Sequence, residues 1–242
     1  MQRKISISLD DLIQQAKYLN QLPRLVELAI QSQVLLRTAE NQGMIITKSD
    51  LQQSADRLRV EHKLLSAKDT LAWLKAQYFS LDDFEALSYF SLVRSRLIDE
   101  TISDKQVERL FIDRTLEYGR AAIYEVVFSS WELAMEIYYG LLEHETDFLA
   151  VLHEYNPQPN LRSVRRKDLS PDCSAVVFAS NPPALLSPIR LRKSVHLIYV
   201  ASLNPAELTP ELRTEIREEA FQDWLNDRVK DWEIEFPERL NQ

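Results

Sequence analysis

The stretch that decides the fold is SPIRLRKSVHLIYVASL, residues 187–203, which reads as a β-hairpin. Two strands, 188–191 and 194–203, are predicted on either side of a basic turn at residues 192–193. β-Branched and aromatic residues dominate the second strand, as a half-buried pleated surface favours. That strand contains one histidine, His196. If His196 faces a pocket it is the best candidate for chemistry, and if it faces the core it is a hydrogen-bonded strand histidine.

The composition excludes several classes of protein. With 242 residues the chain suits one large domain or two small ones. Its three glycines are too few for a glycine-rich phosphate loop or a dinucleotide fingerprint. Its single cysteine, Cys173, excludes an intramolecular disulfide and a thiolate zinc site. The four histidines have no convincing ligand spacing, so we expect neither a metal site nor a cofactor.

The charge and hydropathy of the chain indicate which partners and which cellular compartment to expect. The net charge of -8 argues against nucleic-acid binding, because neutralising a phosphate backbone requires a basic surface. The N-terminal residues are basic, but no apolar segment of a signal peptide follows them. No run is long enough to span a bilayer, so we expect no membrane insertion. These features predict a cytoplasmic protein, unless a leader has been removed, and they leave the oligomeric state open.

Residues 1–118 are predicted to form an all-helical module. Six helices with short loops are expected, and they are delimited by capping residues and by Gly43 and Gly119. Ser8 or Asp10 is expected to cap the first helix, which runs through Asn20. The other predicted helices cover residues 23–43, 51–63, 68–78, 81–102 and 104–118, with Ser49 or Asp50 capping that at 51–63.

Residues 119–204 have a different periodicity, which predicts a small β-α-α-β-α-β-β domain. Its expected elements before the hairpin are a strand at 120–128, helices at 131–145 and 146–155, a strand at 163–169 and a helix reaching Ala179. Residues 205–242 contain a last helix with an apolar side. That helix either packs back on the helical module or remains exposed to bind a partner, and we expect the former. The fold class is therefore predicted to be α+β.

Four segments of the middle domain resemble the parvulin-type peptidyl-prolyl isomerases. RAAIYEVVF resembles the family's first strand, and ETDFLAVLHEYN is similar to its G-x-x-F-x-x-L-A-x-x-x-S segment. Val177-Phe178-Ala179 followed by L-S-P-I resembles its F-x-l…G-x-(l/v)-S-x-P-(v/i) element, and S-V-H-L-I resembles its G-(y/i)-H-(l/i)-I strand. A parvulin domain between a helical module and a C-terminal helix also resembles SurA- and PrsA-type foldases.

The active-site motif of that family is degenerate in this chain. A histidine of the family's first strand is replaced by Glu125, beside Tyr124, and Gln158 lies where the family has a cysteine or aspartate. The family's second histidine corresponds to His196. The resemblance therefore implies a catalytic group of His196 with Glu125 or Tyr124, and Gln158 beside the substrate.

Other residues are candidates for substrate binding. A dry pocket helps an amide to rotate, because the twisted amide tolerates desolvation better than the planar one. We expect such a pocket beside His196, lined by Leu169, Cys173, Phe178 and Leu186. Basic residues on the second strand and in the hairpin, Arg165 and Arg192 among them, form either a solvated face or a site for an acidic peptide or partner protein.

Three functions remain open from the sequence. The first, which the resemblance implies, is a parvulin-like foldase or peptide chaperone of bacterial type. It would grip proline-containing or extended apolar segments of a client protein or precursor peptide, with weak or no turnover. The second is an active peptidyl-prolyl isomerase. The third is a non-catalytic scaffold in peptide maturation or export that binds one partner.

Overall fold

A computed structural model of the chain describes residues 5–144, 146–156 and 160–235. Contacts divide the chain into two compact units. The helical unit comprises Met1–Val107 and Thr214–Gln242, and the sheet unit comprises Glu108–Arg213. Both junctions fall inside helices, α6 (Asp104–Asp113) and α11 (Pro210–Val229), whereas the sequence suggested boundaries after residues 118 and 204.

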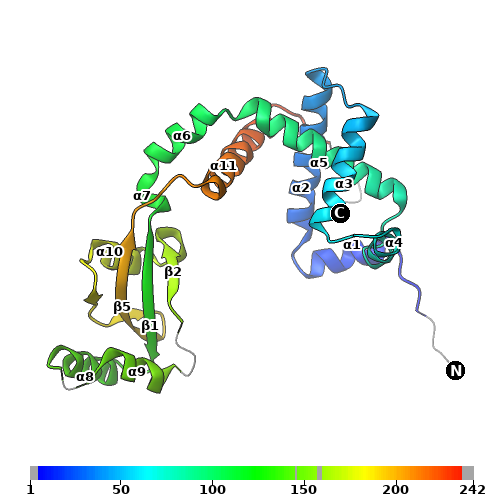
Figure 1. The fold of residues 1–242 in the computed structure, drawn as a ribbon. Coiled ribbons are helices and arrows are strands. Elements are labelled where there is room, and N and C mark those ends of the chain that lie inside the picture. Colours follow the sequence, from blue (N-terminus) through cyan, green and yellow to red (C-terminus); the bar gives the residue numbers. More distant parts are fainter. Residues whose placement is uncertain (1–4, 145, 157–159, 236–242) are drawn as a thin grey trace. The chain divides into compact units, whose positions relative to one another are not determined.

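Capping boxes define the starts of the helices in the helical unit. Besides the parts of α6 and α11, this unit contains α1 (Leu9–Tyr18), α2 (Leu22–Asn41), α3 (Lys48–Glu61), α4 (Ala67–Ala76) and α5 (Leu81–Thr101) (Figure 1). In each of α1, α3, α4 and α5, a Ser or Thr side chain accepts from a backbone N–H three residues later, and the Asp found there binds back.

Two helix predictions in this region need correction. The cap of α3 is Thr47, not Ser49 or Asp50, because Thr47 forms a reciprocal box with Asp50 and so moves the start of the helix to Lys48. The predicted helix 104–118 is interrupted at Arg114, whose φ of -118° and ψ of 21° are not helical. It consists of α6 and the short α7 (Thr115–Tyr118).

The C-terminal helix packs on the helical unit, as predicted. Phe221 of α11 is fully buried, and the guanidinium of Arg94 from α5 lies 5.5 Å from the centre of its ring. Arg94 also binds the Glu218 carboxylate through both terminal nitrogens. Gln31 of α2 donates to Asn226 over 3.0 Å. Phe221 and the polar contacts around it therefore join α11 to α2 and α5.

The sheet unit is built on an antiparallel sheet. Its strands follow the order β2-β1-β5-β3, and β4 also pairs with β5. The elements after α7 are β1 (Arg120–Phe128), α8 (Trp131–Leu142), α9 (Phe148–Tyr155), β2 (Arg162–Arg165), a 3-10 turn (Arg166–Asp168), α10 (Pro171–Ala179), β3 (Ala184–Leu185), β4 (Ile189–Leu191) and β5 (Ser194–Asn204). Helices in one unit and a small antiparallel sheet in the other confirm the α+β fold.

The second strand is shorter than predicted, and one strand was missed. Residues 163–169 were expected to be extended throughout, but β2 ends at Arg165. There the Asp168 carboxylate accepts a hydrogen bond from the Arg165 backbone N–H over 2.8 Å, which favours the 3-10 turn. The two-residue β3 lies in a segment for which the sequence predicted only a break at its prolines.

Each face of the sheet supports its own core. Alternation sends successive residues of β1 and β5 to opposite faces. One face packs with α8 and α9, which bury Ala134, Leu141, Phe148, Val151 and Leu152. The other face packs with α10, which buries Cys173 and Val177. From Ile123 to Phe128 in β1 and from Val195 to Val200 in β5, alternate residues therefore face alternate cores, and beyond Ile123 and Val200 a bulge shifts the register.

Within the residues that the structure describes, every helix is too short or too polar to cross a membrane.

Replacing Phe221 tests how α11 is held. We expect Phe221→Ala to lower the free energy of unfolding by about 3–5 kcal/mol, because it removes a fully buried ring and leaves a cavity. Asp223→Ala changes an exposed residue of the same helix and is the control. Urea unfolding of the full chain measures both. Equal stability of the two variants would contradict the packing of α11 described above.

Candidate functional site

His196 and Glu125 lie beside each other on the α10 face of the sheet. In the register of β1 and β5, Glu125 faces Ile198 and Val127 faces His196, so the two side chains are diagonal neighbours. The His196 Nδ1 atom and the Glu125 Oε1 atom are 2.7 Å apart. Strand pairing thus joins two groups that are far apart in the sequence, and the structure brings these two predicted site residues together.

Ser194 and Arg162 extend this contact into a row of four polar side chains. The Ser194 Oγ atom lies 2.7 Å from His196 Nε2 and 3.1 Å from the Leu191 carbonyl oxygen. At the other end, Arg162 of β2 donates to the second carboxylate oxygen of Glu125. We call Ser194, His196, Glu125 and Arg162 the polar row.

The polar row is partly withdrawn from water. The side chains of His196 and Glu125 are 16% and 17% exposed, whereas that of Arg162 is 47% exposed. A half-buried carboxylate is costly unless it is hydrogen-bonded, and here it has one partner on each oxygen. Both ring nitrogens of His196 likewise have a partner within the protein. The row is therefore satisfied internally.

The four apolar residues predicted to line a pocket beside His196 differ in how deeply they are buried. Cys173 and Leu186 are 1% and 8% exposed and belong to the core between the sheet and α10. Leu169 and Phe178 pack against that core and are only partly buried. Of the four, Leu169 and Phe178 reach the surface, and the Arg166 guanidinium lies 4.3 Å from the centre of the Phe178 ring.

Burial raises the pKa of the Cys173 thiol, and the nearby Glu125 charge raises it further. The Arg162 charge acts in the opposite direction and lowers the pKa. These influences place the thiol close to the polar row. They also keep it protonated near neutral pH, which is unsuited to a nucleophile.

The structure separates Tyr124 from the site. Strand alternation turns its side chain to the α8 and α9 face, where its ring centre lies 6.5 Å from that of Phe148. Tyr124 therefore cannot substitute for a first-strand histidine beside His196, and that part of the prediction is corrected. The signal was available, because Tyr124 and Glu125 are adjacent in one strand and must face opposite sides.

The remaining predicted residues have separate surroundings. Arg165 is 7% exposed, and its guanidinium lies 5.8 Å from the Tyr118 ring centre. Its side chain therefore packs inside the protein and is not open to a ligand. Arg192 is exposed in the β4–β5 turn, with a φ of +56°. Gln158 lies outside the described residues.

A basic cavity adjoins the hairpin end of the sheet. Its volume is about 340 Å³, and its charged lining comprises Arg190, Arg192, Lys193 and Glu132. Arg190 lies 5.3 Å from the ring centre of Trp131, another lining residue. Ser194 also lines this cavity. The basic hairpin that the sequence singled out therefore contributes to a concave surface.

Sequence reasoning missed Ser194 as a site residue. The signal was its spacing of two from His196 in a strand, which places both side chains on one face. What the sequence could not show is that the hydroxyl and the imidazole are within hydrogen-bonding distance. Among the residues with described positions, no group of three His, Cys, Asp or Glu side chains could hold a metal ion.

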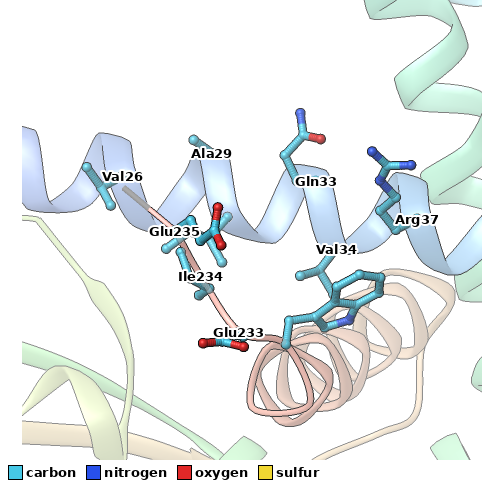
Figure 2. A pocket seen from close by; sticks show the side chains of 10 residues that line it. Val26, Ala29, Gln33, Val34, Arg37, Glu233, Ile234 and Glu235 are labelled. Carbon is cyan, nitrogen blue, oxygen red and sulfur yellow. The ribbon is translucent and has the colours of Figure 1, made fainter. Parts of the chain in front are cut away.

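The helical unit contains a second candidate site, a groove between α2 and the segment after α11. Its volume is about 540 Å³. Figure 2 shows Val26, Ala29 and Val34 on α2, with Ile234 on the opposite segment. Trp232 lies beside them, while Arg37, Glu233 and Glu235 supply charge. The groove thus combines an apolar floor with charged residues.

Comparison with known proteins found similar solved structures but no similar sequences. No protein-family profile matches the chain, and no curated protein matches it. Among solved structures, the chain is similar to PrsA, a peptidylprolyl isomerase, from Bacillus anthracis. Identity is 14%, coverage is 88% of this chain and 99% of that one, and the TM-score is 0.46.

Two further solved structures are of the same kind. PrsA from Bacillus cereus is 15% identical, with coverage of 95% and 90% and a TM-score of 0.47. A SurA-like chaperone from Campylobacter jejuni is 12% identical, with coverage of 93% and 89% and a TM-score of 0.32.

The raised pKa of Cys173 predicts a thiol that is unreactive in the native protein. Near neutral pH we expect Ellman's reagent to modify it at least about tenfold more slowly than in the urea-unfolded chain, since reaction requires an accessible thiolate. The unfolded chain is the control for reagent and pH. Equal rates would show that Cys173 is open to solvent.

Proposed function

We propose that this chain is a parvulin-like foldase that acts mainly as a peptide-binding chaperone. It grips proline-containing or extended apolar segments of a client protein or precursor peptide, with weak or no isomerase turnover. The observation that carries the proposal is the groove of the helical unit, whose apolar lining includes Val26, Ile30, Val34, Trp232 and Ile234. Figure 2 shows Val26, Val34 and Ile234 of this lining.

The groove suits a client that binds weakly and reversibly. Burying one Val, Leu or Phe side chain of a client contributes about 1.5–3 kcal/mol. Ordering each residue of an extended chain costs about 1–2 kcal/mol in backbone entropy. The free energy gained by burying two or three client side chains therefore exceeds the entropy cost of ordering those residues only slightly. Such a balance permits release, which a chaperone needs.

Exposed apolar residues around α1 extend the surface available to a client. Every residue of α1 is at least partly exposed, and Leu9 and Leu12 are 73% and 57% exposed. Leu19, Leu25 and Leu28 are also exposed. Single exposed apolar residues are common on proteins, but several in adjacent helices are typical of surfaces that bind other chains.

The polar row supports binding rather than turnover. Rotation about an amide bond has a barrier of about 18–20 kcal/mol, so catalysis requires groups that stabilise the twisted state. His196 already uses Nδ1 for Glu125 and Nε2 for Ser194. Glu125 also binds Arg162. A client amide would have to displace one of these partners.

An active isomerase is the second candidate, and the contact between His196 and Glu125 favours it. The two groups that the resemblance places in the catalytic position are 2.7 Å apart. If a client displaced Ser194, the imidazole would be held by Glu125 in a defined orientation with one nitrogen free. The chaperone and the active isomerase therefore differ in one respect. Only in the isomerase does the amide of a bound proline segment gain contacts when it is twisted.

Substitution in the groove tests the chaperone. Ala29→Asp places a charge in the groove, and Ala86→Asp makes the same substitution at an exposed residue of α5 outside the groove lining. We expect Ala29→Asp to weaken suppression of client aggregation several-fold, because an apolar segment would have to desolvate the carboxylate. Ala86→Asp should have the smaller effect. Equal effects of both would contradict a client site in the groove.

A protease-coupled isomerisation assay on short proline peptides tests turnover. We expect little or no acceleration, whether or not His196 is replaced by alanine. Clear turnover that His196→Ala abolishes would establish the active isomerase. Stoichiometric binding of one partner, without any effect on denatured clients, would instead favour a scaffold.

A further inference from the structure

We infer that the groove between α2 and the segment after α11 prefers clients whose apolar segments carry lysine or arginine. The inference rests on the proposed function, because it names the class of client for the same groove. It is carried by Glu233 and Glu235, two carboxylates of the groove lining. Neither has an ion-pair partner among the residues that the structure describes.

The turn that ends α11 brings this acidic segment to the groove. The backbone N–H groups of Lys230, Asp231 and Trp232 donate to carbonyl oxygens three residues earlier, over 3.1, 3.1 and 3.2 Å. Such bonds tighten the last turn of a helix and satisfy its free carbonyl groups. The residues that follow, 233–235, then line the groove together with residues of α2 (Figure 2). Local backbone bonding therefore decides where the two carboxylates lie.

The cations near the groove already have carboxylate partners. Arg37 is the cation of the groove lining, and two more cations lie in the turn and at the end of α11. Each forms an ion pair with a residue three positions away, and the pairs are Arg37–Glu40, Arg228–Asp231 and Lys230–Asp227, at 3.3, 3.4 and 2.7 Å. Within the described part of the chain, Glu233 and Glu235 are thus the charges of the groove that are left uncompensated.

Trp232 offers a second contact for a cation. Its side chain lines the groove and is 38% exposed. Among the side chains with described positions, its ring has neither an aromatic nor a cationic neighbour. The face of an indole attracts a lysine or arginine within about 6 Å. The methylene groups of such a side chain can cover apolar surface while its charged end reaches a carboxylate.

The apolar floor and the acidic residues have different effects on binding. Val26, Val34 and Ile234 favour any apolar segment, because the hydrophobic effect depends on the area buried and has no direction. Glu233 and Glu235 distinguish between clients, because they attract a cation and repel a carboxylate. One exposed ion pair changes an affinity by about 1.4- to fivefold. The preference is therefore moderate and leaves binding reversible.

Binding of three synthetic peptides to the full chain tests the preference. The peptides share the apolar centre Leu-Ala-Val-Leu, have acetylated and amidated ends, and are flanked on both sides by Lys, by Ser or by Glu. Isothermal titration calorimetry measures each Kd. We expect the Lys peptide to bind at least about threefold more tightly than the Ser peptide, and the Glu peptide to bind more weakly than both. Equal affinity for the Lys and Ser peptides would overturn the inference.

Two double variants locate the preference in the groove. Glu233→Gln with Glu235→Gln removes both charges and keeps the size of the side chains. Glu85→Gln with Glu100→Gln removes the same charge from exposed residues of α5 outside the groove lining and is the matched control. We expect the Lys-to-Ser preference to fall at least about twofold in the first variant and to stay unchanged in the second.

Two results with these variants would contradict a preference set by the groove. An equal fall in both would show a general attraction of cations to a chain of net charge -8. An undiminished preference in Glu233→Gln with Glu235→Gln would show that another part of the surface selects the cation. The comparison of peptides on the unchanged protein needs no variant to fold.

The outcomes separate this inference from the proposed function. If the three peptides bind equally, and Ala29→Asp weakens all of them, the groove binds clients without regard to charge, so the inference fails and the proposed function stands. If no peptide binds, both fail. Sedimentation velocity of the same samples detects a second copy of the chain as the occupant. A dimer that excludes the Lys peptide would overturn the inference.

Discussion

The antiparallel pairing of β1 with β5 is the constraint on which the sheet unit depends. It joins a strand that begins the unit to one that ends it, and the intervening helices cover the two faces. Because both strands are central in the sheet, their side chains form parts of both cores. The same register places Glu125 beside His196. The pairing that forms the centre of the sheet therefore also forms the contact between His196 and Glu125.

The polar row has to satisfy a carboxylate and an imidazole in a setting that is mostly apolar. Each polar atom that is partly removed from water needs a partner, and the row supplies partners along its length from Ser194 to Arg162. This explains why charged and hydroxylated residues are tolerated beside Cys173 and Ile198. It also means that any ligand of the site must compete with contacts already made within the protein.

The two units differ in the kind of surface they offer. The helical unit exposes apolar side chains in a groove and along α1, where binding depends on burying area and is not specific for one sequence. The sheet unit offers directed hydrogen bonds and a cavity with three cationic side chains. A foldase that holds varied clients needs the first kind of surface, whereas defined chemistry needs the second.

Periodicity, capping residues and strand propensity determined the element types and most of their order, because these signals act between residues close in the chain. They also predicted the hairpin and placed His196 in its second strand. Strand alternation alone would have put the side chains of Tyr124 and Glu125 on opposite faces of the sheet. Tertiary structure decided what lies across the sheet, since register depends on packing of both faces. Hence the contacts of Ser194 and Arg162, the burial of Cys173 and the groove beside α2 could not be read from sequence. Each requires segments distant in the chain to meet at a particular distance.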